Sequence, residues 1–133
     1  MAGETSLALL LRDMQPHLNT GEFVFCCVAD ASLLQGVTVL GSFQEQEGLT
    51  VILAREQADA LGLPYDYVAA WITLTVHSDL AAVGLTAAFA TALGNAGISC
   101  NVIAGYHHDH LFVAHTDAER AVGVLQQLSE QSR

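Results

Sequence analysis

Hydrophobic positions in the first half of the chain follow two different patterns. From Leu7 to Leu18 apolar residues recur every three to four positions, which is the spacing of one helix face. Glu22–Ala29 is a continuous apolar run, as expected of a strand covered on both faces. The other elements predicted in this half are an edge strand over Val37–Phe43, a strand over Glu47–Ala54 and a helix over Arg55–Leu61 that ends at Gly62.

The second half shows a more regular alternation. Aliphatic side chains occupy every second position from Ala70 to His77, which predicts a strand. A helix is expected to follow over Leu80–Ala96, capped by Ser78 or Asp79. The last predicted elements are strands over Ile98–Tyr106 and His110–His115, a turn at His107–Asp109 between them, and a helix that opens on a Thr116–Glu119 capping box.

The order of these elements repeats along the chain. Each half reads as helix, strand, strand, helix, and the strand Ala70–His77 lies between the halves. Strand–helix–strand–strand–helix–strand is the ferredoxin-like plan, an antiparallel sheet with both helices on one face. We therefore expect an α+β fold of two side-by-side modules, residues 1–66 and 67–133. Each module lacks one strand, which must be shared, replaced by Val37–Phe43 or supplied by another chain.

The helix expected over Leu80–Ala96 carries no charged residue. A helix that lies on a sheet normally keeps a charged face toward water, so the outer face here is expected to pack on something. A membrane span is ruled out because the stretch is short and contains glycines, threonines and an asparagine. A homodimer or a tight contact between modules is the preferred explanation.

The composition is that of a folded, acidic protein. Of its 133 residues, 52% are hydrophobic and 14% are charged, which supplies ample material for a core. Acidic residues outnumber basic residues 14 to 4. Such a surface does not attract phosphate backbones or anionic lipid, so neither nucleic acid nor a membrane is expected as a partner.

The cysteines and the N-terminal stretch bear on the cellular compartment. The apolar run Leu7–Leu11 is cut short by Arg12, and no basic segment precedes it, so no signal peptide is predicted. The three cysteines form no Cys-x-x-Cys pair, which favours reduced, buried thiols. Together these features predict a cytoplasmic protein.

Candidate chemistry gathers in "GYHHDHLFV", Gly105–Val113, which holds three histidines and an aspartate in four positions. In the ferredoxin-like plan the third strand lies between the first two, which run parallel. The end of the strand Ala70–His77 and the turn His107–Asp109 therefore emerge at one end of the sheet. Since adjacent strands lie about 4.8 Å apart, His110 is expected near His77 or Ser78.

Three interpretations of this polar cluster compete with a purely structural one. A metal site could use His77, His108, Asp109 and His110, but consecutive histidines at a hairpin tip point apart. A catalytic site could use Ser78 with a histidine and an aspartate, yet no nucleophile elbow or phosphate-binding glycine loop is present. In the structural alternative, the histidines are turn residues and Asp79 caps its own helix.

The third interpretation is a small-ligand site. The first N–H groups of the helix after Asp79 favour a carboxylate, and Gly84 would let a ligand approach closely. Asp79 would repel a bare carboxylate, though it could pair with an amino group. Because an amino acid carries both charges, it is preferred over a simple anion.

Several long motifs also carry a family resemblance. Trp71–Val113 resembles the ACT domain, and more closely a family of small bacterial ACT-domain-containing proteins of unassigned function. The shared motifs are "AVGLTA" (Ala82–Ala87), "NVIAGYxHDHLFV" (Asn101–Val113), "EGLT" (Glu47–Thr50) and "FVFC" (Phe23–Cys26).

The resemblance implies two paired ACT modules, similar to the regulatory modules of aspartokinases. In ACT domains the loop after the first strand and the start of the next helix commonly bind an amino-acid effector at a module interface. Carried over to this chain, that loop is His77–Gly84, which includes Leu80 and Val83. The resemblance further implies that Asn101 reaches a ligand of the neighbouring module.

The sequence thus predicts a cytoplasmic, homodimeric, non-enzymatic regulatory protein that binds a small amino-acid-like ligand at a module interface, without a cofactor. The alternatives are a metal-binding protein or metal-dependent enzyme that uses the histidine cluster, and a protein–protein interaction module. The predicted ligand-binding residues are His77, Ser78, Asp79, Leu80, Val83, Gly84, Asn101, His108, Asp109 and His110.

Overall fold

The computed structural model describes residues 6–76 and 79–133, which form two compact units. The larger unit joins the chain up to Thr20 with Ala70–Arg133, and the smaller unit is Gly21–Ala69. The larger unit contains α1 (Leu7–Asp13), β1 (Pro16–Leu18), most of β5 (Val68–Leu74), α3 (Leu85–Asn95), β6 (Cys100–Ala104), β7 (Asp109–Ala114), a 3-10 turn (His115–Asp117) and α4 (Ala118–Gln131).

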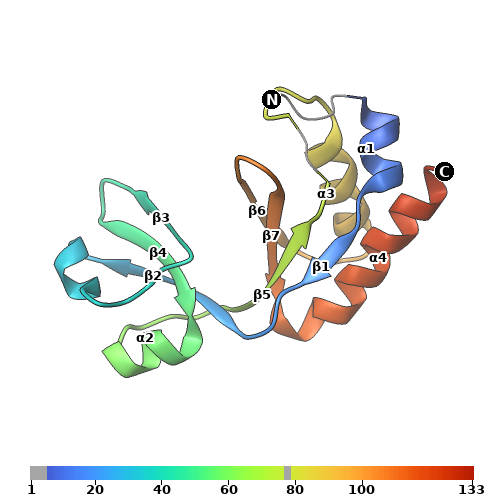
Figure 1. Ribbon diagram of the computed structural model, residues 1–133. Coiled ribbons are helices and arrows are strands. Elements are labelled where there is room, and N and C mark those ends of the chain that lie inside the picture. The colour runs from blue at the N-terminus through green and yellow to red at the C-terminus, as the bar shows by residue number, and fades with distance from the viewer. Residues whose placement is uncertain (1–5, 77–78) are drawn as a thin grey trace. The chain divides into compact units, whose positions relative to one another are not determined.

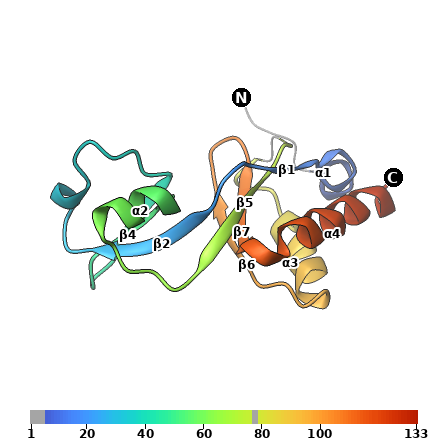
Figure 2. The same ribbon diagram turned by 90° about the horizontal axis from the view of Figure 1, so that it is seen from below.

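The larger unit is a complete ferredoxin-like fold. Its strands lie in the order β1-β5-β7-β6, and β1 is antiparallel to β5, as β6 is to β7. Reading from β5, the chain supplies strand, helix, strand, strand and helix, and β1 takes the fourth strand position. The strand missing from the C-terminal sequence module therefore comes from the N-terminal segment. Figures 1 and 2 show α1, α3 and α4 on the same side of this sheet.

The core of the larger unit lies between the sheet and these helices. Alternate strand residues such as Ile72 and Leu111 face the helices because side chains along a strand point to opposite sides in turn. Phe89 of α3 and Leu125 of α4 pack against them, and all four side chains are 0% exposed. Full burial of such a side chain stabilises the fold by about 1.5–3 kcal/mol, which makes this cluster the main source of stability in the unit.

The smaller unit follows the same plan in reduced form. Its elements are β2 (Phe23–Val28), a 3-10 turn (Ala31–Leu34), β3 (Gly41–Gln44), β4 (Leu49–Ala54), α2 (Arg55–Leu61) and the first two residues of β5. The strand order is β3-β4-β2-β5, with antiparallel pairing throughout. The 3-10 turn stands where the first helix of the plan would be, and Val68–Ala69 provides the fourth strand.

Several predicted elements are confirmed. Strands over Glu22–Ala29 and Glu47–Ala54 appear as β2 and β4, and the helix over Arg55–Leu61 is α2. Gly62 ends α2 in the left-handed conformation, with φ +68°. Among the described residues, all three cysteines are free thiols, and no helix has both the length and the apolar character needed to cross a membrane.

Two sequence predictions are wrong, each for a local reason, and a third has shifted bounds. The helix expected from Leu80 begins at Leu85, because Gly84 has φ +100° and cannot continue a right-handed helix. The final helix begins at Ala118 after a 3-10 turn, and the Thr116–Glu119 capping box does not form its N-cap. The edge strand expected over Val37–Phe43 is present as β3, Gly41–Gln44, which starts four residues later and fills the second strand position of the smaller unit.

Candidate functional site

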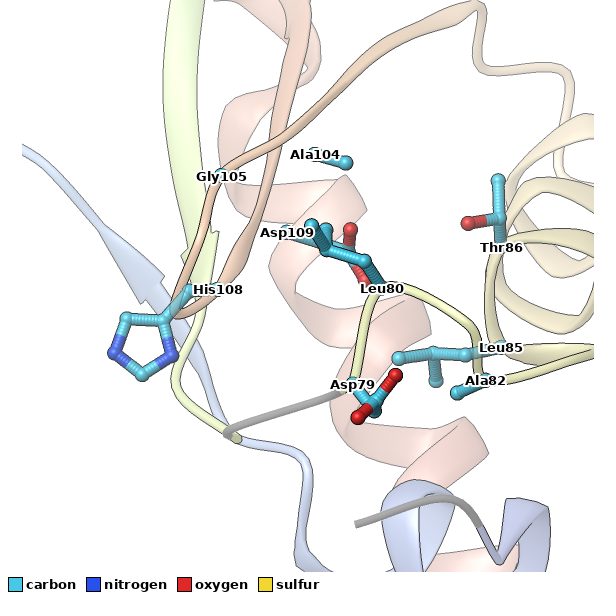
Figure 3. Close-up of a pocket in the computed structure, with 9 residues that line it drawn as sticks. All are labelled: Asp79, Leu80, Ala82, Leu85, Thr86, Ala104, Gly105, His108 and Asp109. Carbon is cyan, nitrogen blue, oxygen red and sulfur yellow. The ribbon is translucent and has the colours of Figure 1, made fainter. Parts of the chain in front are cut away.

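A small pocket lies in the larger unit, between the loop that precedes α3, the first turn of α3 and the β6–β7 hairpin (Figure 3). Its volume is about 80 Å³. One water needs roughly 10–15 Å³ of such space, so the pocket can hold several waters or a small ligand. It is lined by Asp79, Leu80, Ala82, Leu85, Thr86, Ala104, Gly105, His108 and Asp109.

The hairpin is a tight turn that only glycine permits at its first position. Ala104 and Asp109 are the last paired residues, and the Gly105 N–H donates to the His108 carbonyl at 2.9 Å. A Cβ atom on Gly105 would lie 2.9 Å from that carbonyl oxygen and 3.1 Å from Nε2 of His110. The glycine therefore allows the turn and the His110 ring to pack together.

Asp109 is the charged group that the hairpin brings to the pocket. Its side chain shares one face of β7 with those of Leu111 and Val113, so it lies on the helix-covered side of the strand. Partial burial raises the pKa of the Asp109 carboxyl, and His110 and His108 partly oppose this shift. Within the described part of the chain, no hydrogen bond to this carboxylate is found. A half-buried carboxylate of this kind is suited to receive a cationic or N–H donor from a ligand.

Asp79 already accepts two hydrogen bonds within its own turn. Its Oδ1 accepts the Ala81 N–H at 2.8 Å, and its carbonyl oxygen accepts the Ala82 N–H at 2.9 Å. The stretch from Asp79 to Ala82 is therefore an Asx-type turn, and Asp79 does not cap α3. Gly84 is the N-cap of α3 and has no side chain that could cap the helix, so the first N–H groups of α3 receive no side-chain hydrogen bond at this position. Leu85 and Thr86, in the first turn of α3, line the pocket.

His110 lies on the opposite face of the strand from Asp109. Nε1 of Trp71 donates to Nδ1 of His110 at 3.1 Å, and Oγ1 of Thr73 lies 3.1 Å from the same nitrogen. Burial is the main cause that lowers the pKa of His110, the His108 ring lowers it further, and Asp109 opposes both. This residue was predicted to contact the ligand, but it does not line the pocket.

The other predicted residues divide into two groups. Asp79, Leu80, His108 and Asp109 are brought together at the pocket, and the His108 ring points away from the two loop residues (Figure 3). His77 and Ser78 lie outside the described residues. Val83, Gly84 and Asn101 do not line the pocket; Val83 is 83% exposed, and the Asn101 amide lies 3.5 Å from the Phe112 carbonyl.

Sequence reasoning missed the lining residues that are small or apolar. Ala82, Ala104 and Gly105 have no side chain that signals binding, and Leu85 looks like any core residue. Thr86 was missed because the helix was expected to start six residues earlier than this threonine. A helix predicted to begin directly after Gly84 would have placed Thr86 in its first turn.

The described part of the proposed metal quartet does not converge. No group of three or more histidine, cysteine or acidic side chains that could hold a metal is found among residues 6–76 and 79–133. His110 directs Nδ1 at Trp71, whereas Asp109 lies on the other face of β7. His77 lies outside the described residues, so this result concerns His108, Asp109 and His110.

Gly84 offers a test of how α3 begins. We expect Gly84→Ala to lower the free energy of unfolding by about 1–2 kcal/mol, because an L-residue is strained in the left-handed region. Its φ is +100°, and a Cβ would also lie 3.0 Å from Leu7. Urea unfolding measures the loss. The matched control is Gly94→Ala, inside α3 with open space around its Cα, which should be neutral or stabilising. Equal stability of both variants would contradict this account.

Comparisons with known proteins agree on one family. Two family models described as "ACT domain" match the chain, one over residues 2–70 and the other over residues 67–127. A Vibrio cholerae protein of unknown function, described as a possible transport protein, is 46% identical; the match covers 94% of this chain and 97% of that chain, with a TM-score of 0.82. No curated protein sequence matches the chain.

More distant solved structures share the fold. The regulatory subunit of aspartate kinase from Thermus thermophilus, in a ligand-free form, is 11% identical over 85% of this chain and 95% of that chain, with a TM-score of 0.67. Aspartokinase III from E. coli, in complex with aspartate and ADP, is 13% identical over 85% of this chain and 32% of that chain, with a TM-score of 0.62. At these identities the likeness concerns the fold alone.

Proposed function

The chain belongs to the ACT domain family, and from this premise we propose that it is a regulatory protein that binds a small amino-acid-like ligand in the pocket of the larger unit. The observation that carries the proposal is the half-buried Asp109 carboxylate, which lines the pocket and has a raised pKa. Burial disfavours the charged form of this carboxyl group, and an ammonium group of the ligand would stabilise that form by pairing with it.

The two ends of the pocket suit the two charges of an amino acid. Asp109 would take the ammonium group, and the N-terminal N–H groups of α3, next to Thr86, would take the carboxylate. No arginine lines the pocket, and Asp79 adds a second acidic side chain. We therefore propose a ligand with a small, uncharged side chain, and we expect aspartate and glutamate to be repelled.

The assembly is part of the same proposal. Leu80 is 66% exposed and Val83 is 83% exposed, and both lie in the loop that borders the pocket. Such apolar side chains support a contact that covers the loop, as in the expected homodimer with the ligand at a module interface. A cytoplasmic location and a non-enzymatic role complete the proposal, and Asn101 keeps its proposed part in reaching a neighbouring module.

A thermal-shift screen against the twenty amino acids tests the function. We expect small neutral amino acids to raise Tm, since a ligand at a hundredfold over its Kd adds about 2.7 kcal/mol of stability. Aspartate and glutamate at the same concentration serve as the internal control. A flat response to every amino acid would contradict the proposal and favour the interaction module, whereas stoichiometric zinc in untagged protein would favour the metal-binding alternative.

A further inference from the structure

A hydrogen-bond network occupies the helix-free face of the larger unit and centres on His110. Nδ1 of His110 receives the indole N–H of Trp71 at 3.1 Å and lies 3.1 Å from Oγ1 of Thr73. The Asn19 amide in turn donates to Oγ1 of Thr73 at 3.0 Å and to the Trp71 carbonyl at 3.2 Å. The His110 ring thereby joins β7 to β5, and Asn19, which follows β1, joins that segment to the same two residues of β5.

The donors in this network fix the protonation state of His110. An indole N–H can only donate, so Nδ1 must be without a proton. Oγ1 of Thr73 already accepts from Asn19 and lies 3.1 Å from the same nitrogen, so its hydroxyl group can donate to Nδ1 in the neutral form of the ring. His110 is therefore neutral, with its proton on Nε2. The imidazolium form would place an N–H at Nδ1, facing the Trp71 N–H at 3.1 Å.

The ring is also packed against the hairpin that lines the pocket. A Cβ on Gly105 would lie 3.1 Å from Nε2 and 3.2 Å from Cδ2 of His110, so the ring is close to that turn residue. Gly105 and Asp109 both line the pocket, and Asp109 directly precedes His110 in β7. The His110 ring is therefore packed against the same turn whose other side lines the pocket.

We propose that His110 is a proton-sensitive positioning residue, so that uptake of a proton at Nδ1 breaks its bond with Trp71, shifts the hairpin and weakens ligand binding. Only the last step, the weakening of ligand binding, rests on the proposed function. The site is competent when His110 is neutral and loses affinity as the pH falls.

The charged groups around His110 are few. Asp109 and His108, on its own hairpin, are the charges that act on it within the described part of the chain, and β5 and β6 contribute uncharged neighbours. The β1 segment contributes the Asn19 amide, and His17 lies opposite Thr73 in the register. Burial lowers the pKa of His110, so the transition falls below 6.5, the ordinary value for histidine.

A fluorescence titration without ligand tests the switch itself, because Trp71 is the one tryptophan of the chain. We expect a sigmoidal change in emission below pH 6.5 in the wild type. His110→Asn should abolish this change, since its Oδ1 can occupy the place of Nδ1 as an acceptor that does not protonate. His115→Asn, at the exposed far end of β7, should retain it. Persistence of the transition in His110→Asn would overturn the inference.

A second variant guards against misfolding of the first. Trp71→Phe removes the N–H that opposes protonation, so the pKa of His110, followed by NMR of the imidazole ring, should rise. An unchanged pKa of His110 in Trp71→Phe would also overturn the inference, because the bond to Trp71 would then not select the neutral form.

Calorimetry with alanine as the probe tests the coupling to the pocket. In the wild type, Kd should rise by up to about tenfold per pH unit below the transition, the limit for one linked proton. His110→Asn should remove this rise, whereas Asp109→Asn should keep the fluorescence transition. Failure of alanine and every other amino acid to bind would sink the proposed function but leave the fluorescence result to decide on the switch. The same pH dependence of Kd in His110→Asn and wild type would overturn the coupling.

Discussion

Asparagine in place of Asp109 is expected to abolish the response to small amino acids at neutral pH. The substitution keeps the shape of the side chain but removes the charge that would pair with the ligand ammonium group. Truncation of one partner of a buried charge pair costs about 2–5 kcal/mol. Since Asp109 is only half-buried, we expect the lower end, about thirtyfold in Kd. Isothermal titration calorimetry with alanine measures the loss.

The fold of this variant should be intact, and its stability gives an independent check. Because partial burial raises the pKa of Asp109, the charged form is disfavoured in the folded state, and wild-type stability should gain as the pH falls through that raised pKa toward 3.8. Asp109→Asn should lack this gain and be at least as stable as the wild type at neutral pH. Asp66→Asn, on an exposed carboxylate of the smaller unit, is the matched control and should change neither property. Wild-type affinity in Asp109→Asn would refute the proposed ligand site.

The sequence predicted elements well where one period holds over enough residues. β5 has such a period, β2 follows instead from a continuous apolar run, and α2 has a clear glycine stop at Gly62. β1 was not predicted because Leu18 fits the helical spacing that begins at Leu7, whereas Pro16–Leu18 form a strand because β5 pairs with them. The start of α3 was misplaced because the positive φ of Gly84 cannot be told from an ordinary helix glycine in the sequence.

The candidate site was predictable to the extent that topology determines it. The ferredoxin-like plan places the loop after β5 and the β6–β7 turn at one end of the sheet, and Asp79 and Asp109 do line one pocket. Strand alternation already puts His110 on the face opposite Asp109, and of the two only Asp109 lines the pocket. The hydrogen bond from Trp71 to His110 depends on β5 and β7 being neighbours in the sheet and on their register, and no local sequence pattern encodes either.

Leu10→Ala is expected to lower the free energy of unfolding by about 2–5 kcal/mol, the usual cost of a cavity at a fully buried leucine. Leu10 is 0% exposed and lies in the same core cluster as Phe89 and Leu125, although the sequence expectation assigned it to a module of residues 1–66. Urea unfolding gives the overall loss, and native-state hydrogen exchange shows which amides lose protection.

The pattern of exchange decides to which unit the first helix belongs. Because α1 packs on α3 and α4, amides of Leu85–Gln131 should lose protection in Leu10→Ala. The matched control is Leu7→Ala on the same helix, where the side chain is 37% exposed and the cost should stay below about 1 kcal/mol. If protection fell only within Gly21–Ala69, α1 would stabilise the smaller unit, as the 1–66 division predicts, and the account of β1 as the fourth strand of the larger fold would lose its energetic basis.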